Sequence, residues 1–347
     1  MNILENPHRG TGPLHPEAPF PSVAAGRVAE LLELCPAAAQ TPLADAGELA
    51  PVAALWVKDE RARMGLGSFK ALGAAYVIAR QAADLSATPD SSTLGGRTYV
   101  TASAGNHGMS VAAGARIFGA NAVVYIAETV PQGFADRLAA RGAEVRREGA
   151  DYAASMTAAL KAAKDNGWTL LSDSSWTGYT ELPHILMEGY LQMAAEAVAQ
   201  CPEPPTHILL QAGVGGLAGA VATYARHVWG DGPKIIVVEP ENAPALQASI
   251  RAGHCVFADG PDSIMGRLDC KEPSLIALNG LARDADLFLT LTDAEVNSQL
   301  PVLAGAGLAT TASGGAGVAA VLMPGARAAI GIGPDARVLT FLSEQPE

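Results

Sequence analysis

Short apolar runs alternate with longer amphipathic segments along most of the chain, and this alternation predicts repeated β and α units. Strands are expected at 54–60, 98–102, 122–127, 144–147, 169–172, 207–211, 234–239, 287–291 and 337–342. Helices are expected at 22–34, 70–83, 109–118, 131–141, 152–166, 183–200, 217–229, 243–252, 273–282 and 293–303. Units of this kind build parallel sheets covered by helices on both faces. We therefore predict an α/β fold of two open-sheet lobes with a cleft between them.

Two stretches lack this periodicity. Residues 1–20 are rich in Pro, Gly and His and predict an irregular surface arm. Residues 86–97 are polar, contain Gly and Pro, and are the best candidate for a domain boundary in the first third of the chain. The segments 263–269 and 310–317 are dense in small residues and are interpreted as loops, although 310–317 also fits the start of a tightly packed helix.

Composition narrows the functional classes. The 347 residues are 49% hydrophobic and carry a formal net charge of −12, which argues against nucleic acid or an anionic membrane as the main partner. The four cysteines are scattered and form no metal-binding pattern, as expected in a reducing compartment. The sequence shows neither a secretory leader nor a run of 18 apolar residues, so we expect a cytoplasmic protein that does not enter the membrane.

Lys70 is a single lysine in the uncharged segment 67–73, directly before a helical pattern. The positive end of the helix dipole and apolar surroundings both disfavour the ammonium form, so the pKa of Lys70 is expected to fall. A neutral lysine amine can act as a nucleophile and form a Schiff base. Taken alone, Lys70 fits a surface position on a first helical turn just as well.

The loop after the strand 98–102 contains polar groups suited to a small anion. Ser103, Asn106 and the backbone N–H groups at the following helix start would bind a carboxylate at the carboxyl edge of a parallel sheet. A hydrophilic turn that needs Gly105 for a positive φ is the alternative, and His107 alone is more often structural than catalytic. Asp173 ends another strand and is expected to point into the same cleft.

A glycine-rich loop follows the strand 207–211. In Gly213-Val214-Gly215-Gly216, backbone amides can converge, and the next helix adds its positive end, so the loop predicts a phosphate site. The spacing of Gly213, Gly215 and Ala218, with Glu239 at the end of the next strand, also approaches a dinucleotide fingerprint. The loop by itself does not decide whether the bound phosphate belongs to a dinucleotide or to another ligand.

Together these motifs resemble one family. Ser68-Phe69-Lys70, Ser103-Ala104-Gly105-Asn106-His107 and Gly213–Gly216, in this order, look like the pyridoxal-phosphate enzymes of the tryptophan synthase β-like fold (fold type II). The resemblance runs from Thr41 onward. Within the group the chain is most similar to the diaminopropionate ammonia-lyases, and the matching segments are 57–60, 69–73, 173–179, 264–268 and Glu272-Pro273.

The resemblance implies a cofactor, pyridoxal 5'-phosphate, and roles for individual residues. Lys70 would hold the cofactor as a Schiff base and remove the α-proton, with Asp173 assisting the leaving group. Ser343 would face the pyridine nitrogen, and its neutral hydroxyl would favour loss of a β-substituent over transamination. The implied cofactor-binding residues are Lys70, Phe69, Asn106, Gly213, Val214, Gly215, Gly216, Leu217 and Ser343. The implied substrate-binding residues are Ser103, Ala104, Gly105, Asn106, His107 and Asp173.

The resemblance also implies the organisation of the protein. Residues 1–95 and 175–347 would form the large cofactor-binding domain. Residues 96–174 would form a small inserted domain that contributes the loop for the substrate carboxylate. The expected partners are a small amino-acid substrate and a second copy of the chain in a homodimer.

Two departures from the family pattern concern the substrate. Diaminopropionate ammonia-lyases usually carry an acid at the position of Ala104, whereas Ser-Ala-Gly-Asn-His is the version of serine/threonine dehydratase-like members. The stretch 313–316 also lacks a glutamate that relatives carry nearby.

The predicted reaction is β-elimination from a diaminopropionate-like or 3-hydroxy amino acid, giving a 2-keto acid and ammonia. A β-replacement synthase, an NAD-dependent dehydrogenase and a non-catalytic ligand-binding relative are the alternatives.

Overall fold

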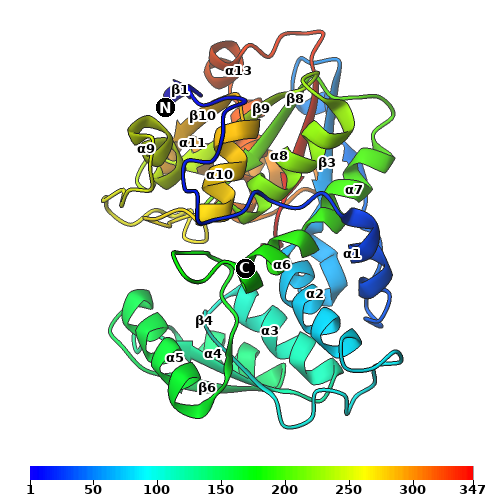
Figure 1. Cartoon of the computed structure of the whole chain (residues 1–347). Coiled ribbons are helices and arrows are strands. Elements are labelled where there is room, and N and C mark those ends of the chain that lie inside the picture. Colours follow the sequence, from blue (N-terminus) through cyan, green and yellow to red (C-terminus); the bar gives the residue numbers. More distant parts are fainter. Residues whose placement is uncertain (347) are drawn as a thin grey trace.

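Two sheets organise the molecule. The computed structural model describes residues 1–346 and shows two lobes, each built around its own sheet (Figure 1). The larger sheet has the strand order β1-β10-β9-β8-β11-β3-β2, and the smaller has the order β6-β5-β4-β7. The strands of the larger sheet are β1 (Asn2–Glu5), β2 (Leu43–Asp45), β3 (Ala54–Asp59), β8 (His207–Gln211), β9 (Lys234–Pro240), β10 (Leu287–Leu291) and β11 (Arg337–Leu342). Those of the smaller are β4 (Thr98–Ala102), β5 (Asn121–Ile126), β6 (Ala143–Arg147) and β7 (Thr169–Leu170).

The strands that carry site loops run parallel. The five inner strands of the larger sheet and all four strands of the smaller pair in parallel, while β1 and β2 are antiparallel edges. Parallel sheets are buried on both faces, which explains continuous apolar strands such as Ile235–Val238 in β9. Because parallel strands share one carboxyl edge, the loops that leave each sheet gather on one side. β11 (red) ends where the lobes meet (Figure 1).

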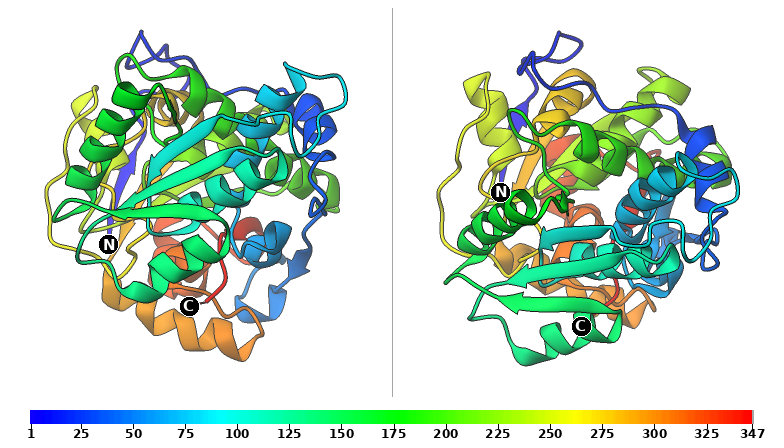
Figure 2. Two further views of the ribbon diagram at one scale, coloured as in Figure 1. Left: turned by 90° about the horizontal axis from the view of Figure 1, so that it is seen from below. Right: turned by 60° about the horizontal axis from the view of Figure 1, so that its bottom comes forward.

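Helices cover both sheets. They are α1 (Ala25–Leu32), α2 (Lys70–Ala83), α3 (Asn106–Ile117), α4 (Gln132–Ala140), α5 (Tyr152–Asn166), α6 (Glu181–Gly189), α7 (Leu191–Gln200), α8 (Gly216–Trp229), α9 (Ala245–Ala252), α10 (Leu275–Asp284), α11 (Asp293–Gly305), α12 (Ala312–Leu322) and α13 (Pro324–Ile330), with 3-10 turns at Gly47–Leu49 and Glu60–Gly65. Figure 2 shows the small sheet from below with helices packed against it. The helices α2 and α6 approach closely at Gly189, where an added Cβ would lie 2.7 Å from the carbonyl oxygen of Leu72.

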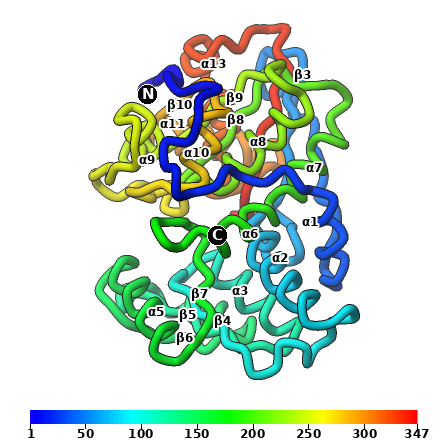
Figure 3. The backbone as a smooth tube through the Cα atoms, viewed as in Figure 1, coloured from blue at the N-terminus to red at the C-terminus, as the bar shows by residue number. Residues whose placement is uncertain are grey.

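The N-terminal arm crosses the large lobe from β1 to α1 (Figure 3). The side-chain amide of Asn6 donates to the Ala285 carbonyl at 2.6 Å, and that of Asn279 donates to the Ala18 carbonyl at 2.8 Å. These side-chain amides therefore join the arm to α10 and to its C-terminal end. No helix within residues 1–346 is long and apolar enough to cross a membrane.

All nine predicted strands are present, within two residues at each end, but two other predictions were wrong and one helix was missed. The arm is not wholly irregular, because β1 pairs with β10 far away in sequence. The predicted helix 183–200 is two helices that meet at the buried residue Tyr190. Of the two readings of 310–317, the tightly packed helix start is confirmed for most of the segment, because α12 begins at Ala312 and its Gly and Ala residues are all buried. Helix α13 was missed. Each error concerns packing or pairing between distant segments, which local periodicity does not report.

Candidate active site

Lys70 and Asp173 form an ion pair between the lobes. Lys70 is the first residue of α2, Asp173 follows β7, and the Lys70 ammonium donates a hydrogen bond to the Asp173 carboxylate. Burial lowers the pKa of Lys70, but the charge and hydrogen bond of Asp173 outweigh it, so the pKa is raised. The expectation of a lowered pKa was therefore wrong, because it assumed apolar surroundings. Burial alone would raise the pKa of Asp173, but Lys70 holds it well below its usual range.

The C-terminal strand fixes the segment that leads to Lys70. The backbone N–H of Phe69 donates to the carbonyl of Ser343 at 3.1 Å, and that of Gln345 donates to Gly67 at 2.9 Å. The Phe69 ring packs on Tyr190 with 4.9 Å between ring centroids. The structure thus brings Phe69, Lys70 and Ser343 together, although more than 270 positions separate the first and last of them.

The glycine loop after β8 forms a cradle of backbone donors. Gly215 has a φ of +96° and precedes the first residue of α8, Gly216. Within residues 1–346, the N–H groups of Gly215, Gly216 and Leu217 have no hydrogen-bond acceptor. A Cβ at Gly213 would lie 2.9 Å from the Cys270 sulfur, so the close approach of the next loop requires glycine. Unpaired amides at a helix N-terminus fit a phosphate group.

The Asn106 loop opens α3 in the small lobe. Asn106 is the first residue of the helix, and its side-chain amide donates to the carboxylate of Glu344 in the large lobe. Ser103 accepts a hydrogen bond from the N–H of Gly105 at 3.3 Å. Ala104 is half-buried and packs against the core. The start of the helix therefore presents small side chains and backbone donors, as a carboxylate site requires.

His107 links the Asn106 loop to the strand that carries Asp173. Its Nε2 lies 2.8 Å from the carbonyl oxygen of Leu171, so this nitrogen carries the proton and donates. Burial lowers the pKa of His107, which keeps the ring neutral. Its Nδ1 is buried and has no hydrogen-bond partner within residues 1–346. The ring thus holds the two loops in register.

A pair of serines links the Asp173 loop to the glycine loop. The hydroxyls of Ser175 and Ser274 are 2.7 Å apart, and the N–H of Ser274 donates to the carbonyl of Val214 at 2.9 Å. Both serines are buried. The loops bearing Asp173 and Val214 therefore form one connected unit.

Residues that sequence reasoning missed lie at the centre of the site. The Glu344 carboxylate is buried, and its partners are Asn106, the Thr311 hydroxyl and the Arg267 Nε, the last at 2.9 Å. Cys270 lies near Lys70, and burial raises the pKa of its thiol to about 11. The sequence did offer one signal for Glu344, because this acidic residue directly follows Ser343 at the end of the last predicted strand.

Glu239 does not have the role that a dinucleotide site requires. Its buried carboxylate accepts the N–H groups of Leu246 at 2.7 Å and Gln247 at 2.8 Å at the start of α9. Both carboxylate oxygens are thus occupied inside the protein. The reading of Glu239 as a ribose-binding acid was wrong.

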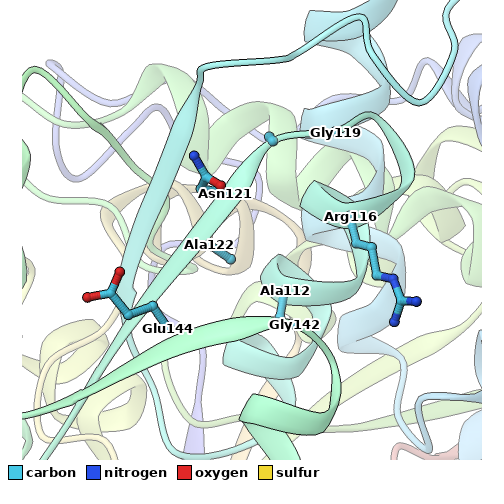
Figure 4. Close-up of a pocket in the computed structure, with 8 residues that line it drawn as sticks. Ala112, Arg116, Gly119, Asn121, Ala122, Gly142 and Glu144 are labelled. Atoms are coloured by element: carbon cyan, nitrogen blue, oxygen red, sulfur yellow. The ribbon is translucent and has the colours of Figure 1, made fainter.

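A surface pocket of about 270 Å³ lies elsewhere, on the small lobe (Figure 4). Arg116, Asn121 and Glu144 contribute its polar side chains. It sits at the amino end of β5 and β6, opposite the edge where loops of a parallel sheet bind ligands. This pocket is separate from the Lys70 site.

A lysine amine opposite a phosphate cradle, between two α/β lobes, defines a class of enzymes that bind a phosphorylated aldehyde cofactor. A family model for pyridoxal-phosphate dependent enzymes matches residues 34–344. The chain therefore belongs to the pyridoxal-phosphate dependent enzyme family.

Relatives specify the class further. The chain is 34% identical over 280 residues to the diaminopropionate ammonia-lyase of Salmonella typhimurium, covering 74% of this chain and 69% of the relative. The Escherichia coli K12 enzyme of the same name is 36% identical over 270 residues, covering 73% and 68%. A crystal structure of the E. coli enzyme with an aminoacrylate–pyridoxal-phosphate azomethine intermediate has a TM-score of 0.87 at 29% identity, covering 99% of this chain and 93% of that one.

These matches confirm three of the predictions. The fold is that of a fold type II enzyme, the cofactor is pyridoxal 5'-phosphate, and the chain is a lyase of the ammonia-lyase and dehydratase class that catalyses β-elimination. The unpaired backbone N–H groups of the glycine loop fit the phosphate of this cofactor. The partly exposed side chain of Lys70 fits its aldehyde.

Proposed function

We propose that the enzyme removes an amine or hydroxyl from the β-carbon of a free amino acid, giving a 2-keto acid and ammonia. The observation that carries the proposal is the Lys70–Asp173 pair beside the glycine cradle. A base and an acid are needed on one substrate, and these two side chains already lie within contact. The diaminopropionate ammonia-lyases among its relatives support an amine as leaving group, and the threonine and serine dehydratases support a hydroxyl.

Residues from both lobes would hold the cofactor. Lys70 binds it through the amine, and Gly213–Leu217 bind its phosphate through backbone N–H groups. Phe69, braced by Tyr190, and Ser343 flank the lysine. Bound pyridoxal phosphate supplies an electron-withdrawing conjugated system that acidifies the α-hydrogen of the amino acid. Ser343 offers no charge to protonate the pyridine nitrogen, which favours elimination.

Lys70 and Asp173 would move the protons. A freed Lys70 amine takes the α-hydrogen as general base. Lys70 becomes an ammonium once it has taken the α-hydrogen, and it then lies in hydrogen-bond contact with the Asp173 carboxylate. The pair could pass this same proton on to the departing amine or hydroxyl. Such general acid–base assistance is typically worth about 10²- to 10⁴-fold in rate.

The small lobe would bind the substrate carboxylate. The Ser103 hydroxyl and the backbone N–H groups at the N-terminus of α3, which begins at Asn106, would supply donors. His107 keeps this loop aligned with Asp173. Ala104 supplies no charge. A neutral side chain here removes one attraction for a second ammonium group, which supports 3-hydroxy amino acids beside diaminopropionate as candidates.

The test is a keto-acid assay of the cofactor-loaded enzyme on a panel of β-substituted amino acids in both chiralities. We expect 2-keto acid and ammonia in equal amounts from at least one amino or hydroxy substrate, and none from the Lys70→Ala variant. Added thiols and amines are included as competing nucleophiles. New amino acids in place of keto acid would contradict elimination, and so would an undiminished rate in Lys70→Ala.

The organisation of the enzyme completes the proposal. We propose a large domain of residues 1–95 and 175–347 and an inserted domain of residues 96–174. All strands of the small sheet fall within the inserted segment, which supports this division. Helix α2 of the first segment packs against α3 of the small lobe and links the two domains. A cytoplasmic homodimer is the working state we propose, supported by four unpaired cysteines for the compartment. Size-exclusion chromatography with light scattering tests the dimer.

A further inference from the structure

Glu344 lies where three parts of the site meet. Its backbone belongs to the segment after β11 that pairs with Ser68, two residues before Lys70. The Thr310 hydroxyl donates to the Glu344 carbonyl at 2.6 Å, which fixes the same segment to the approach to α12. The main chain of Glu344 is therefore held on both sides, and its side chain has little freedom to move away from Lys70.

The carboxylate of Glu344 reaches across the cleft. The Oε2 atom accepts the Asn106 amide from the small lobe and pairs with the Arg267 Nε at 2.9 Å. The Oε1 atom accepts the Thr311 hydroxyl. The side chain is only 5% exposed. Burial raises the pKa of Glu344, while Arg267, the Thr311 hydroxyl and the Asn106 amide act in the opposite direction. These partners favour the charged form of the carboxylate beside Asn106.

The hydrogen bond from Asn106 to Glu344 determines the orientation of the Asn106 side-chain amide. An asparagine amide has two N–H hydrogens on one side and an acceptor oxygen on the other. Because Glu344 accepts one of these hydrogens, the nitrogen faces the site and the second hydrogen remains to be donated. A phenolic oxygen on the cofactor ring is an acceptor of the kind that this second hydrogen would bind. Hydrogen bonds of this kind are strengthened by the adjacent charge.

We propose that Glu344 is a positioning residue of the cofactor site, which orients the Asn106 amide as a donor toward the oxygen on the ring of pyridoxal phosphate. It acts through Asn106 and does not touch the reacting atoms. The inference rests on the proposed function only in placing the cofactor beside Lys70 and Asn106; it requires no particular substrate.

The test measures cofactor binding by Glu344→Gln, which keeps the size of the side chain and removes its charge. We expect the dissociation constant for pyridoxal phosphate to rise about tenfold, because one charge-assisted contact is lost. We also expect a shift of the visible absorption band of the lysine-bound cofactor. Asn106→Ala should produce the same shift. The double variant should show little further change in either quantity, since the two residues act as a unit.

Glu203→Gln is the matched control. Glu203 also pairs with an arginine Nε, that of Arg337 at 3.3 Å, but on the surface of the large lobe. This variant should keep the wild-type affinity and spectrum. Denaturant unfolding of each cofactor-free variant reports any general loss of stability. If Glu344→Gln does not fold, Glu344→Asp takes its place, because aspartate keeps the charge but has a shorter side chain. It is then measured alone and combined with Asn106→Ala in the same way.

Two results would overturn the inference. One is a Glu344 variant with the wild-type spectrum and affinity, and the other is full additivity of the Glu344 and Asn106 effects. A merely structural role predicts this second result, with lower stability but an independent effect on the cofactor. Because every readout uses cofactor without substrate, failure of the keto-acid assay on the wild-type enzyme would not affect the outcome.

Discussion

The ammonium group of Lys70 donates a hydrogen bond to the carboxylate of Asp173, 103 positions further along the chain. This contact reverses the effect of burial on Lys70, whose pKa is raised. The cofactor-free enzyme therefore stores its base in protonated form. A neutral amine is needed to bond an aldehyde, so Asp173 is expected to slow cofactor loading and to speed turnover.

Asp173→Asn separates these two effects. Without the carboxylate the largest effect that raises the pKa of Lys70 is gone, and burial is opposed only by the weaker effects of Cys270 and Glu344. The pKa of Lys70 therefore falls and its neutral fraction near pH 7 increases. We expect faster formation of the visible band when pyridoxal phosphate is added, with the pH midpoint of the loading rate displaced downward. Turnover should fall by about 10²- to 10⁴-fold, as for loss of a general acid.

Stopped-flow absorbance against pH measures the loading, and the keto-acid assay measures the turnover. Asp165→Asn is the control with the same change of charge, because Asp165 pairs with Lys161 on an exposed face of α5. Loading that is slower in Asp173→Asn than in wild type would contradict the role of the ion pair.

Gly215→Ala should weaken cofactor binding. The φ of +96° strains any L-residue, and the new Cβ would lie 2.9 Å from that of Ala277 in α10. Strain of this kind costs about 1–3 kcal/mol, and displacement of the loop would misplace its N–H donors. We expect at least a tenfold rise in the dissociation constant for pyridoxal phosphate, measured by fluorescence titration.

Gly167→Ala is the paired control, because Gly167 also has a positive φ, +66°, but has no neighbour within 4 Å of a Cβ. It should lose some stability and keep its cofactor affinity. Equal affinity losses in the two variants would point to global destabilisation.

Glu196 makes stability depend on acid pH. It is buried against Lys58 and Arg63, each at 2.7 Å. Burial raises its pKa, but the two cations outweigh this and lower it from 4.5 to about 2. A depressed carboxyl pKa contributes stability that is full above pH 4.5 and is lost as the pH falls toward 2. This loss amounts to about 3 kcal/mol at most.

Urea unfolding between pH 2 and pH 7 measures the slope. Glu196→Gln should flatten it and, because Lys58 and Arg63 lose a partner, should cost about 3–5 kcal/mol at pH 7. If that variant is unfolded, the Lys58→Met and Glu196→Leu pair removes both charges and should recover stability while keeping the flatter slope. An unchanged acid slope in either variant would assign the pH dependence to other groups.

Ala104→Asp should change substrate preference. A carboxylate in the Asn106 loop would attract the second ammonium group of diaminopropionate. The ratio of kcat/KM for diaminopropionate to kcat/KM for serine should therefore rise about tenfold. Ala104→Asn has nearly the same shape without the charge and should leave the ratio unchanged. The ratio is measured by competition in the keto-acid assay, and an equal gain in both variants would show that charge is not the cause.

The sequence by itself determined the local elements and the motifs. Apolar periodicity located each predicted strand, and Lys70, the Asn106 loop and Gly213–Gly216 were identified from residue type and spacing. These features were accessible because each depends on a few neighbouring residues: a lysine at a helix start, a polar turn before a helix, and a glycine-rich loop with a positive φ at Gly215.

The tertiary structure alone decided how charges meet. It paired Lys70 with Asp173, which reversed the predicted direction of the lysine pKa, and it placed Glu344 against Asn106. It also turned Glu239 inward to cap α9. Electrostatic energies depend on distance and burial in space, and neither quantity is written in the local pattern of the chain.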